Sequence, residues 1–257
     1  HRVLGSVVIA TGLLAAASGF PALGRTLRDR RRLALLAAST VILSANWGLF
    51  IWAVQAGRLV DASLGYYINP LVNVALGVIV LGERLRRWQG VAVALASAGV
   101  LYLAWRHGSV PWVSLGLAVT FGVYGLLRKI APVDVLTGFF AETALLTPVA
   151  LAYVVPRELA GVGALAKGDP HHDVLLAAAG LVTAVPLLCF TAAARRLPLT
   201  TLGFFQYLSP SLQLLLAVRV FGEAFTRDHA VTFALIWAAL AMYSGEAFWH
   251  RGSRPGR

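Results

Sequence analysis

The sequence has 257 residues, of which 58% are hydrophobic and only 13% are charged, and its mean hydropathy is +0.75. A soluble domain carries roughly twice that charged fraction, so this composition excludes an ordinary soluble protein and indicates a membrane protein. The formal net charge of +11 does not indicate nucleic-acid binding, because the arginines lie in short segments between apolar runs rather than on one exposed face.

Nine apolar segments are long enough to cross a bilayer, which takes about 20 residues per helix. In chain order they cover residues 3–20, 33–54, 62–81, 88–105, 110–127, 135–155, 174–194, 199–221 and 231–248. The segments between them are predicted to be loops, and the longest is 156–173. The sequence therefore predicts an all-α polytopic membrane protein.

Two of these spans carry an internal repeat. SLGYY at 63–67 recurs as TLGFF at 201–205, and YINP at 67–70 recurs as YLSP at 207–210. Internal repeats within a membrane protein are typical of secondary transporters, whose substrate site lies between the two copies.

The number of spans before each copy differs. Three spans precede the repeated helix in the second copy but only two in the first, and the chain begins at His1. We therefore expect an N-terminally incomplete ten-helix protein, with a first repeat at 1–107 that lacks its first helix and a second repeat at 108–257. Because five helices per repeat is an odd number, the copies should insert with opposite polarity as an inverted repeat.

The positive charges are distributed unevenly between the two sides of the predicted membrane protein. Loops on one side hold fifteen cationic residues, among them Arg128 and Lys129, and loops on the other side hold six. The positive-inside rule predicts that the richer side is cytoplasmic and that the C-terminus lies there.

Polar residues recur on one face of the repeated helices. Tyr66, Asn69, Pro70 and Asn73 have helical spacing, and their counterparts in the second copy are Gln206, Ser209, Pro210 and Gln213. Such groups are costly in hydrocarbon, and each proline removes a backbone donor and bends its helix. We expect the polar side chains to line a central substrate cavity, with Pro70 and Pro210 as helix bends. The alternative is that the amides only join helices.

Three other residues within spans are candidates for the same cavity. Asn46, Trp47 and Tyr124 offer hydrogen bonds and aromatic faces, and helix packing is an equal alternative for each.

Glu142 is a carboxylate well inside a span. An intramembrane acid is a candidate for proton coupling or for binding a cationic group, and the alternative is a structural pair with a polar partner. Glu83 follows Gly82 at a helix end and recurs as Glu223 after Gly222. These two are predicted to be gating or structural residues, which reach the interface, cap a neighbouring helix or pair with a loop arginine.

Sequence motifs for nucleotide binding and for common hydrolase chemistry are absent. Neither lysine of the chain follows a glycine, as a nucleotide-binding Walker A motif requires, and neither H-E-x-x-H nor G-x-S-x-G occurs. We therefore expect no enzyme activity, no catalytic residue, no metal site and no cofactor. The expected partners are a small-molecule substrate and the lipid bilayer, with protons and a second copy of the chain as candidates, and not nucleic acid.

Two stretches resemble a known family. The sequence from Asp61 to Trp88, and TAVPLLCFTAAARRLPLTTLGFFQYLSPSLQLLLAV at 183–218, resemble the EamA-type drug/metabolite transporters, and most closely their RarD subgroup, which carries the label "chloramphenicol-sensitive protein". The resemblance implies two inverted five-helix repeats with cytoplasmic termini. It also implies export or exchange of small metabolites or drugs across the bacterial inner membrane.

The sequence thus favours a secondary transporter that works by alternating access. Two other classes stay open: a non-transporting membrane scaffold or sensor with the same fold, and a membrane enzyme acting on a lipid-linked substrate. The duplicated polar face favours transport over a scaffold. An enzyme would need a nucleophile, an acid–base pair or a metal set, which the motifs do not provide.

Overall fold

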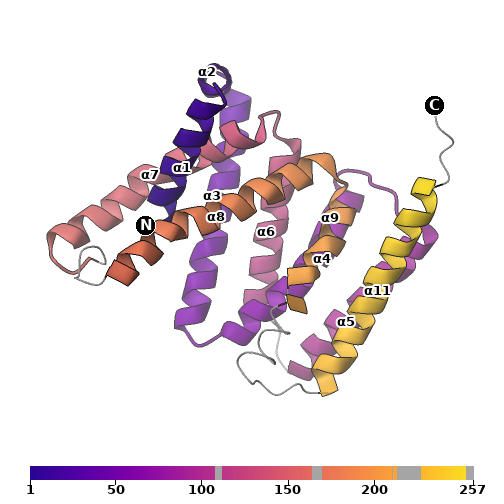
Figure 1. Cartoon of the computed structure of the whole chain (residues 1–257). Helices are drawn as coiled ribbons and strands as arrows, with labels where there is room; N and C mark the ends of the chain where they lie inside the picture. Colours follow the sequence, from indigo (N-terminus) through magenta and orange to yellow (C-terminus); the bar gives the residue numbers. More distant parts are fainter. Residues whose placement is uncertain (108–111, 164–169, 210, 213–226, 253–257) are drawn as a thin grey trace. The chain divides into compact units, whose positions relative to one another are not determined.

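The computed structural model describes the chain except for residues 108–111, 164–169, 210, 213–226 and 253–257 (Figure 1). Within the described residues, the regular secondary structure is helical throughout. The helices are α1 (Arg2–Ala16), α2 (Phe20–Arg28), α3 (Arg30–Gln55), α4 (Leu59–Ile79), α5 (Arg87–His107), α6 (Trp112–Ile130), α7 (Val135–Leu159), α8 (Pro170–Arg196), α9 (Leu199–Gln206) and α11 (Arg227–Gly252).

The helices confirm the prediction of an all-α polytopic membrane protein. Five of the described helices are long and apolar enough to cross a bilayer, or six if the bent pair α1 and α2 counts as one span. Gly65–Ile79 and Ala230–Glu246 are shorter apolar helices. The total of nine spans remains a prediction, because the predicted span 199–221 extends beyond the described residues.

The helices extend into several of the predicted loops. The segment after the first span was predicted to be a loop, but it forms α2, in which Pro21 occupies the first turn and Leu23 packs against a buried apolar cluster. The predicted long loop at 156–173 is shortened from both sides, because α7 continues to Leu159 and α8 begins at Pro170. In α2, the packing of Leu23 and the proline in the first turn outweigh the polar composition of the segment.

The described helices form two compact units. The first unit consists of residues 1–42 and 127–196. In it α1 packs against both α7 and α8, and the Ser6 hydroxyl donates a hydrogen bond of 3.2 Å to the Gly180 carbonyl. A small apolar core is formed by Leu36, Val133 and Ala141.

The second unit consists of residues 43–126 and 197–257, in which α4 packs on α9 and α5 packs on α11 (Figure 1). Its core includes Phe204, which stacks on Tyr243 with 3.9 Å between ring centroids. Both units combine helices from the two halves of the sequence. The division into sequence repeats at 107 and 108 therefore does not coincide with these spatial units, and it remains a prediction.

Contacts within the second unit give the relative direction of α4 and α9. Gly203 approaches Pro70, whereas Thr200, earlier in α9, approaches Gly77, later in α4. The two helices therefore run antiparallel. An inverted repeat requires this direction for the two copies, although the pseudo-two-fold axis itself remains a prediction.

Candidate functional site

The second unit contains a cluster of buried amides that joins α4 to α9. The Asn73 side-chain nitrogen donates a hydrogen bond of 2.8 Å to the Asn69 side-chain oxygen, and another to the Gln206 side-chain oxygen. Asn73 is fully buried and Asn69 is nearly so. The structure thus brings together three residues that the repeat singled out, one of them from the second copy.

Gly203 allows this contact between the two helices. A Cβ atom at Gly203 would lie 2.6 Å from the Pro70 carbonyl oxygen and 3.3 Å from the Asn73 Cβ atom. Small residues let helices in membranes approach closely enough for polar side chains to pair. The repeated glycine therefore sets the backbone distance at which the amides of α4 and α9 meet. The helix α4 continues through Pro70, and the predicted bend there remains a prediction.

One buried atom of the amide cluster is unsatisfied. Among the described residues, no hydrogen-bond partner is found for the Asn73 side-chain oxygen. A buried acceptor without a partner carries a desolvation cost, so it favours a donor supplied by water, a ligand or a rearranged side chain.

Asn46 lies in a different contact of the same unit. Its side-chain nitrogen donates to the Leu117 carbonyl at 2.9 Å and to the Thr120 hydroxyl at 2.8 Å, which joins α3 to α6. This geometry is that of the alternative considered for Asn46, in which an amide holds two helices together.

The predicted aromatic and hydroxyl residues are spread over the second unit. Tyr124 is fully buried, Trp47 is partly buried, and Ser209 is exposed. Tyr66 is 40% exposed, and its ring makes an edge contact with Phe50 at 6.3 Å between centroids. The place of these four side chains in a shared cavity remains a prediction.

Glu83 caps the start of α9. Its carboxylate oxygens accept hydrogen bonds from the backbone N–H groups of Leu199 at 2.8 Å and Thr200 at 2.9 Å. These are N–H groups of the first turn, which have no partner within the helix, and the helix dipole favours a carboxylate there. Of the three structural roles considered for Glu83, the geometry is that of a cap on a neighbouring helix.

Three of the predicted site residues lie outside the described part of the chain. These are Pro210, Gln213 and Glu223.

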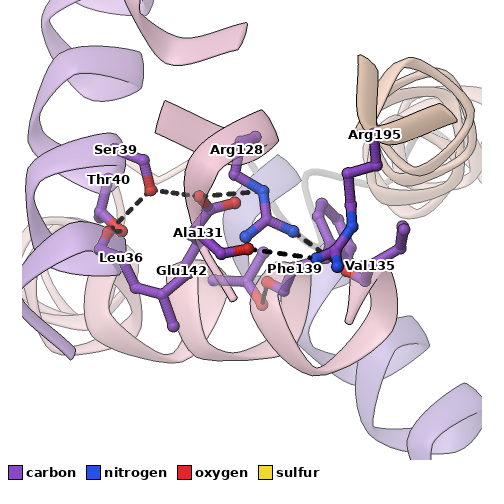
Figure 2. A network of polar contacts seen from close by, with 10 residues as sticks. Leu36, Ser39, Thr40, Arg128, Ala131, Val135, Phe139, Glu142 and Arg195 are labelled. Atoms are coloured by element: carbon purple, nitrogen blue, oxygen red, sulfur yellow. Dashed lines mark hydrogen bonds and ion pairs between the residues drawn. The ribbon is translucent and has the colours of Figure 1, made fainter. Parts of the chain in front are cut away.

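The first unit contains a second polar cluster, centred on Glu142 (Figure 2). The Glu142 carboxylate accepts a hydrogen bond from the Ser39 hydroxyl and lies 3.5 Å from the Arg128 Nε atom. The side chains of Arg128 and Glu142 are 0% and 3% exposed. The carboxylate therefore has a buried counter-ion, as the structural alternative for Glu142 requires.

Arg128 corrects a prediction from the charge pattern. It was assigned to a cytoplasmic loop, but it lies in the last turn of α6 and is fully buried. Its Nη2 atom donates to the Val135 carbonyl at 3.3 Å, and its guanidinium lies directly against Gly138, where a Cβ atom would be 2.2 Å from Nη1. A glycine on α7 thus makes the room that the guanidinium fills.

Neighbouring cations extend the cluster shown in Figure 2. Arg195 Nη1 donates to the Ala131 carbonyl at 3.4 Å. Lys129 Nζ donates to the Ala194 carbonyl at 3.0 Å. Asp134 caps α7 by accepting a hydrogen bond of 2.8 Å from the Thr137 N–H. Burial raises the pKa of Asp134, but the hydrogen bonds from Thr137, the backbone hydrogen bond of Asp134 and the charge of Arg195 together outweigh burial, and the net pKa is lowered.

The sequence pattern did not identify Arg128, Ser39 or Gly138 as partners of Glu142. Gly138 and Glu142 are one helical turn apart, which is a usable signal for a shared face. Nothing in the spacing connects that face to α3 or to the end of α6. Within the described residues, no group of three or more His, Cys, Asp or Glu side chains has the arrangement of a metal site.

The comparisons with known proteins agree on one family. Residues 2–105 match the EamA-like transporter family. Over 95% of its length the chain is 48% identical to an uncharacterized transporter of Vibrio cholerae, and covers 81% of that protein. It is 47% identical to Protein RarD of Escherichia coli, with 97% of this chain and 84% of the relative covered.

Two further similarities extend this result. The chain is 35% identical to the chloramphenicol-sensitive protein RarD of Pseudomonas aeruginosa, with 94% of this chain and 82% of the relative covered. A solved crystal structure with 22% sequence identity matches 98% of this chain and 86% of its own chain, with a TM-score of 0.67. At that identity the structural match shows the fold alone.

Proposed function

Since the chain belongs to the EamA-like transporter family, we propose that it is a secondary transporter that moves a small metabolite or drug across the bacterial inner membrane by alternating access. The family accounts for a multi-pass membrane protein that transports rather than catalyses. The substrate, the mechanism and the orientation are parts of the proposal. The arginine distribution supports a cytoplasmic C-terminus.

The observation that carries the proposal is the amide cluster of Asn69, Asn73 and Gln206. It joins the two helices that bear the internal repeat, and these helices run antiparallel. In inverted-repeat transporters the substrate site is built from such repeat-related helices, and one repeat moves against the other around the site.

Neutral amides suit a contact that must open and close. Breaking the Asn73–Gln206 hydrogen bond leaves no uncompensated charge, and each amide can exchange its partner for water or for a polar group of the substrate. The buried Asn73 oxygen already lacks a partner among the described residues. We assign it the role of accepting a hydrogen bond from the substrate.

Transport by the full-length protein in proteoliposomes tests the proposal, with a panel of amino acids, amines and amphenicols. The amphenicols enter the panel because of the name of the Pseudomonas relative. Asn73→Leu should lower uptake at least tenfold while the protein still folds. The control Gln55→Leu removes an exposed amide from α3 and should leave uptake within twofold.

The same experiment separates transport from a scaffold or sensor. A scaffold would be favoured if the protein moved no member of the panel and if its fluorescence did not change when any of them was added. Equal uptake by Asn73→Leu and the unmodified protein would remove the amide cluster from the substrate site and leave the family assignment intact.

Protons are the candidate driving ions in this proposal, and Glu142 is the candidate proton-responsive group. Its carboxylate is paired with Arg128 and bonded to Ser39, so a change of protonation would have to break that pair. If Glu142 carries the coupling, Glu142→Gln should bind substrate but lose the pH dependence of uptake. An unchanged pH profile would leave Glu142 with a structural role.

A second copy of the chain remains a candidate partner in this proposal. The mass of the detergent-solubilised protein, measured by light scattering, distinguishes a monomer from a homodimer.

A further inference from the structure

The helix α2 differs in composition from the spans around it. Its sequence FPALGRTLR contains two arginines, and residues 30–32, which follow Asp29, are three more. Over residues 20–32 Asp29 is the single acid. Placing this many cationic side chains in the hydrocarbon core would cost too much free energy. This segment therefore belongs at the membrane–water interface.

A sharp turn separates α2 from α1. The two helix axes differ by 114°. Ser18 supplies the turn, with a left-handed φ of 51° that few residues other than glycine adopt. If α1 crosses the bilayer steeply, a helix at this angle runs close to the plane of the membrane.

One side of α2 is attached to the first unit. Leu23 packs against the cluster of Leu36, Val133 and Ala141, and Thr26 is buried. The remaining surface stays open: Phe20 is 48% exposed and Leu27 is 50% exposed. Arg25 and Arg28 are also exposed.

The open surface is strongly amphipathic. On a helical wheel, Phe20 and Leu27 fall on one arc, whereas Arg25 and Arg28 fall on the neighbouring arc. An apolar arc beside a cationic arc is the pattern of helices that lie in the interface, with apolar side chains at the acyl boundary and cations at the headgroups.

The nearby acid Asp29 interacts with the start of α3. Its carboxylate accepts hydrogen bonds from the backbone N–H groups of Arg31 and Arg32, and it pairs with the Arg32 side chain at 2.9 Å. The acid therefore serves the start of α3, and it engages Arg32 rather than the arginines of α2.

We propose that α2 is a binding site for anionic phospholipid, in which Arg25 and Arg28 hold the headgroup phosphate while Phe20 and Leu27 contact the acyl chains. Charge complementarity selects the ligand, because the two arginine cations attract the phosphate, and only in a net-anionic lipid is that phosphate charge not offset by a cationic headgroup. This site is independent of the substrate site and of the direction of transport.

Lipid titration of the detergent-solubilised protein, followed by native mass spectrometry, tests this site. Phosphatidylglycerol should bind more tightly than phosphatidylcholine, and the difference should shrink as the ionic strength rises. Arg25→Gln/Arg28→Gln should weaken phosphatidylglycerol binding roughly 25-fold, because each arginine near an anionic surface contributes about a fivefold change. Arg25→Lys/Arg28→Lys should keep most of the affinity.

The matched control is Arg84→Gln/Arg86→Gln. These exposed arginines lie between α4 and α5, and their replacement removes the same charge. The control should change phosphatidylglycerol affinity less than threefold. The proposal is overturned if the control and the α2 variant lose equal affinity, or if both lipids bind the unmodified protein equally.

A second measurement does not depend on lipid affinity. A spin label at Leu27→Cys, in a Cys189→Ser background, should report an interfacial depth in phosphatidylglycerol nanodiscs, with access to oxygen exceeding access to a water-soluble nickel complex. A label that reports bulk water would overturn the proposed position of α2 at the membrane interface. That result is also the one expected if the partner of α2 is an acidic protein segment instead of lipid.

Discussion

The two buried polar clusters of this protein differ in charge, and the difference indicates different roles. The cluster of Asn69, Asn73 and Gln206 is neutral, whereas the cluster around Arg128 and Glu142 contains a fully buried ion pair. A neutral amide can lose one hydrogen-bond partner at modest cost in free energy. Removing the counter-ion of a buried ion, in contrast, strongly destabilises the fold. The amide cluster suits a contact that opens, and the ion pair suits one that stays closed.

The neighbouring residues strengthen this comparison. Arg128 is held against Gly138 and bonded to Val135, so its position is fixed by α7 as well as by Glu142. Asn73, in contrast, keeps an unsatisfied oxygen among the described residues. One cluster consists of a rigid charged contact, and the other retains hydrogen-bonding capacity.

The largest effect should come from breaking the ion pair. Arg128→Leu leaves a buried carboxylate without its counter-ion and should lower the free energy of unfolding by about 3–5 kcal/mol. The double variant Arg128→Leu/Glu142→Leu should recover much of that loss. Unfolding in mixed detergent micelles, followed by circular dichroism, gives the coupling energy.

The same double-mutant cycle on Asn73 and Gln206 should give a smaller coupling, about 0.5–1.5 kcal/mol. A coupling for the amides that equals or exceeds that of the ion pair would contradict the comparison of the two clusters.

An effect smaller than the loss of the ion pair is expected at the crossing of α4 and α9. Gly203→Ala places a Cβ atom 2.6 Å from the Pro70 carbonyl oxygen, so the helices must separate and the Asn73–Gln206 contact weakens. We expect a loss of about 1–3 kcal/mol in unfolding free energy, together with lower uptake. Thermal unfolding and transport are measured on the same preparations.

The control for this variant is Gly48→Ala in α3, where a Cβ atom meets nothing within 4 Å. It should be neutral or stabilising by about 0.5–1 kcal/mol, since alanine is the better helix former. Equal losses for the two alanine variants would show that the close approach of Gly203 to Pro70 is not responsible.

The smallest effect concerns pH and the Asp134 cap of α7. Its pKa is lowered below the ordinary 3.8, so its contribution to stability is fully present above that value and is lost as the pH falls through the lower, folded pKa. At neutral pH, Asp134→Ala should cost about 1 kcal/mol, and the difference from the unmodified protein should vanish in strong acid. Melting temperatures measured across acidic pH check this.

Asp134→Asn separates the hydrogen bond from the charge. Asparagine also caps helices well, so this variant should stay close to the unmodified protein at neutral pH, without its acid transition. A full loss in Asp134→Asn at neutral pH would assign the effect to charge alone.

The sequence by itself determined the membrane class, the all-helical fold and the family. Apolar runs of this length have no other stable form in a bilayer, because every backbone group must be bonded within its own segment. The repeat also pointed correctly to the amides of α4 and α9 as neighbours, since Asn73 and Gln206 are in contact.

Only the tertiary structure decided which partners the buried charges have. The charge pattern placed Arg128 in a cytoplasmic loop, because a single sequence shows there only a positive charge near the end of a span. Its burial depends on Gly138 and Glu142 of another helix, and the Glu83 cap depends on the distant start of α9. Such pairings join residues far apart in the chain. Sequence periodicity predicts which residues share a face of one helix, but not which other helix that face contacts.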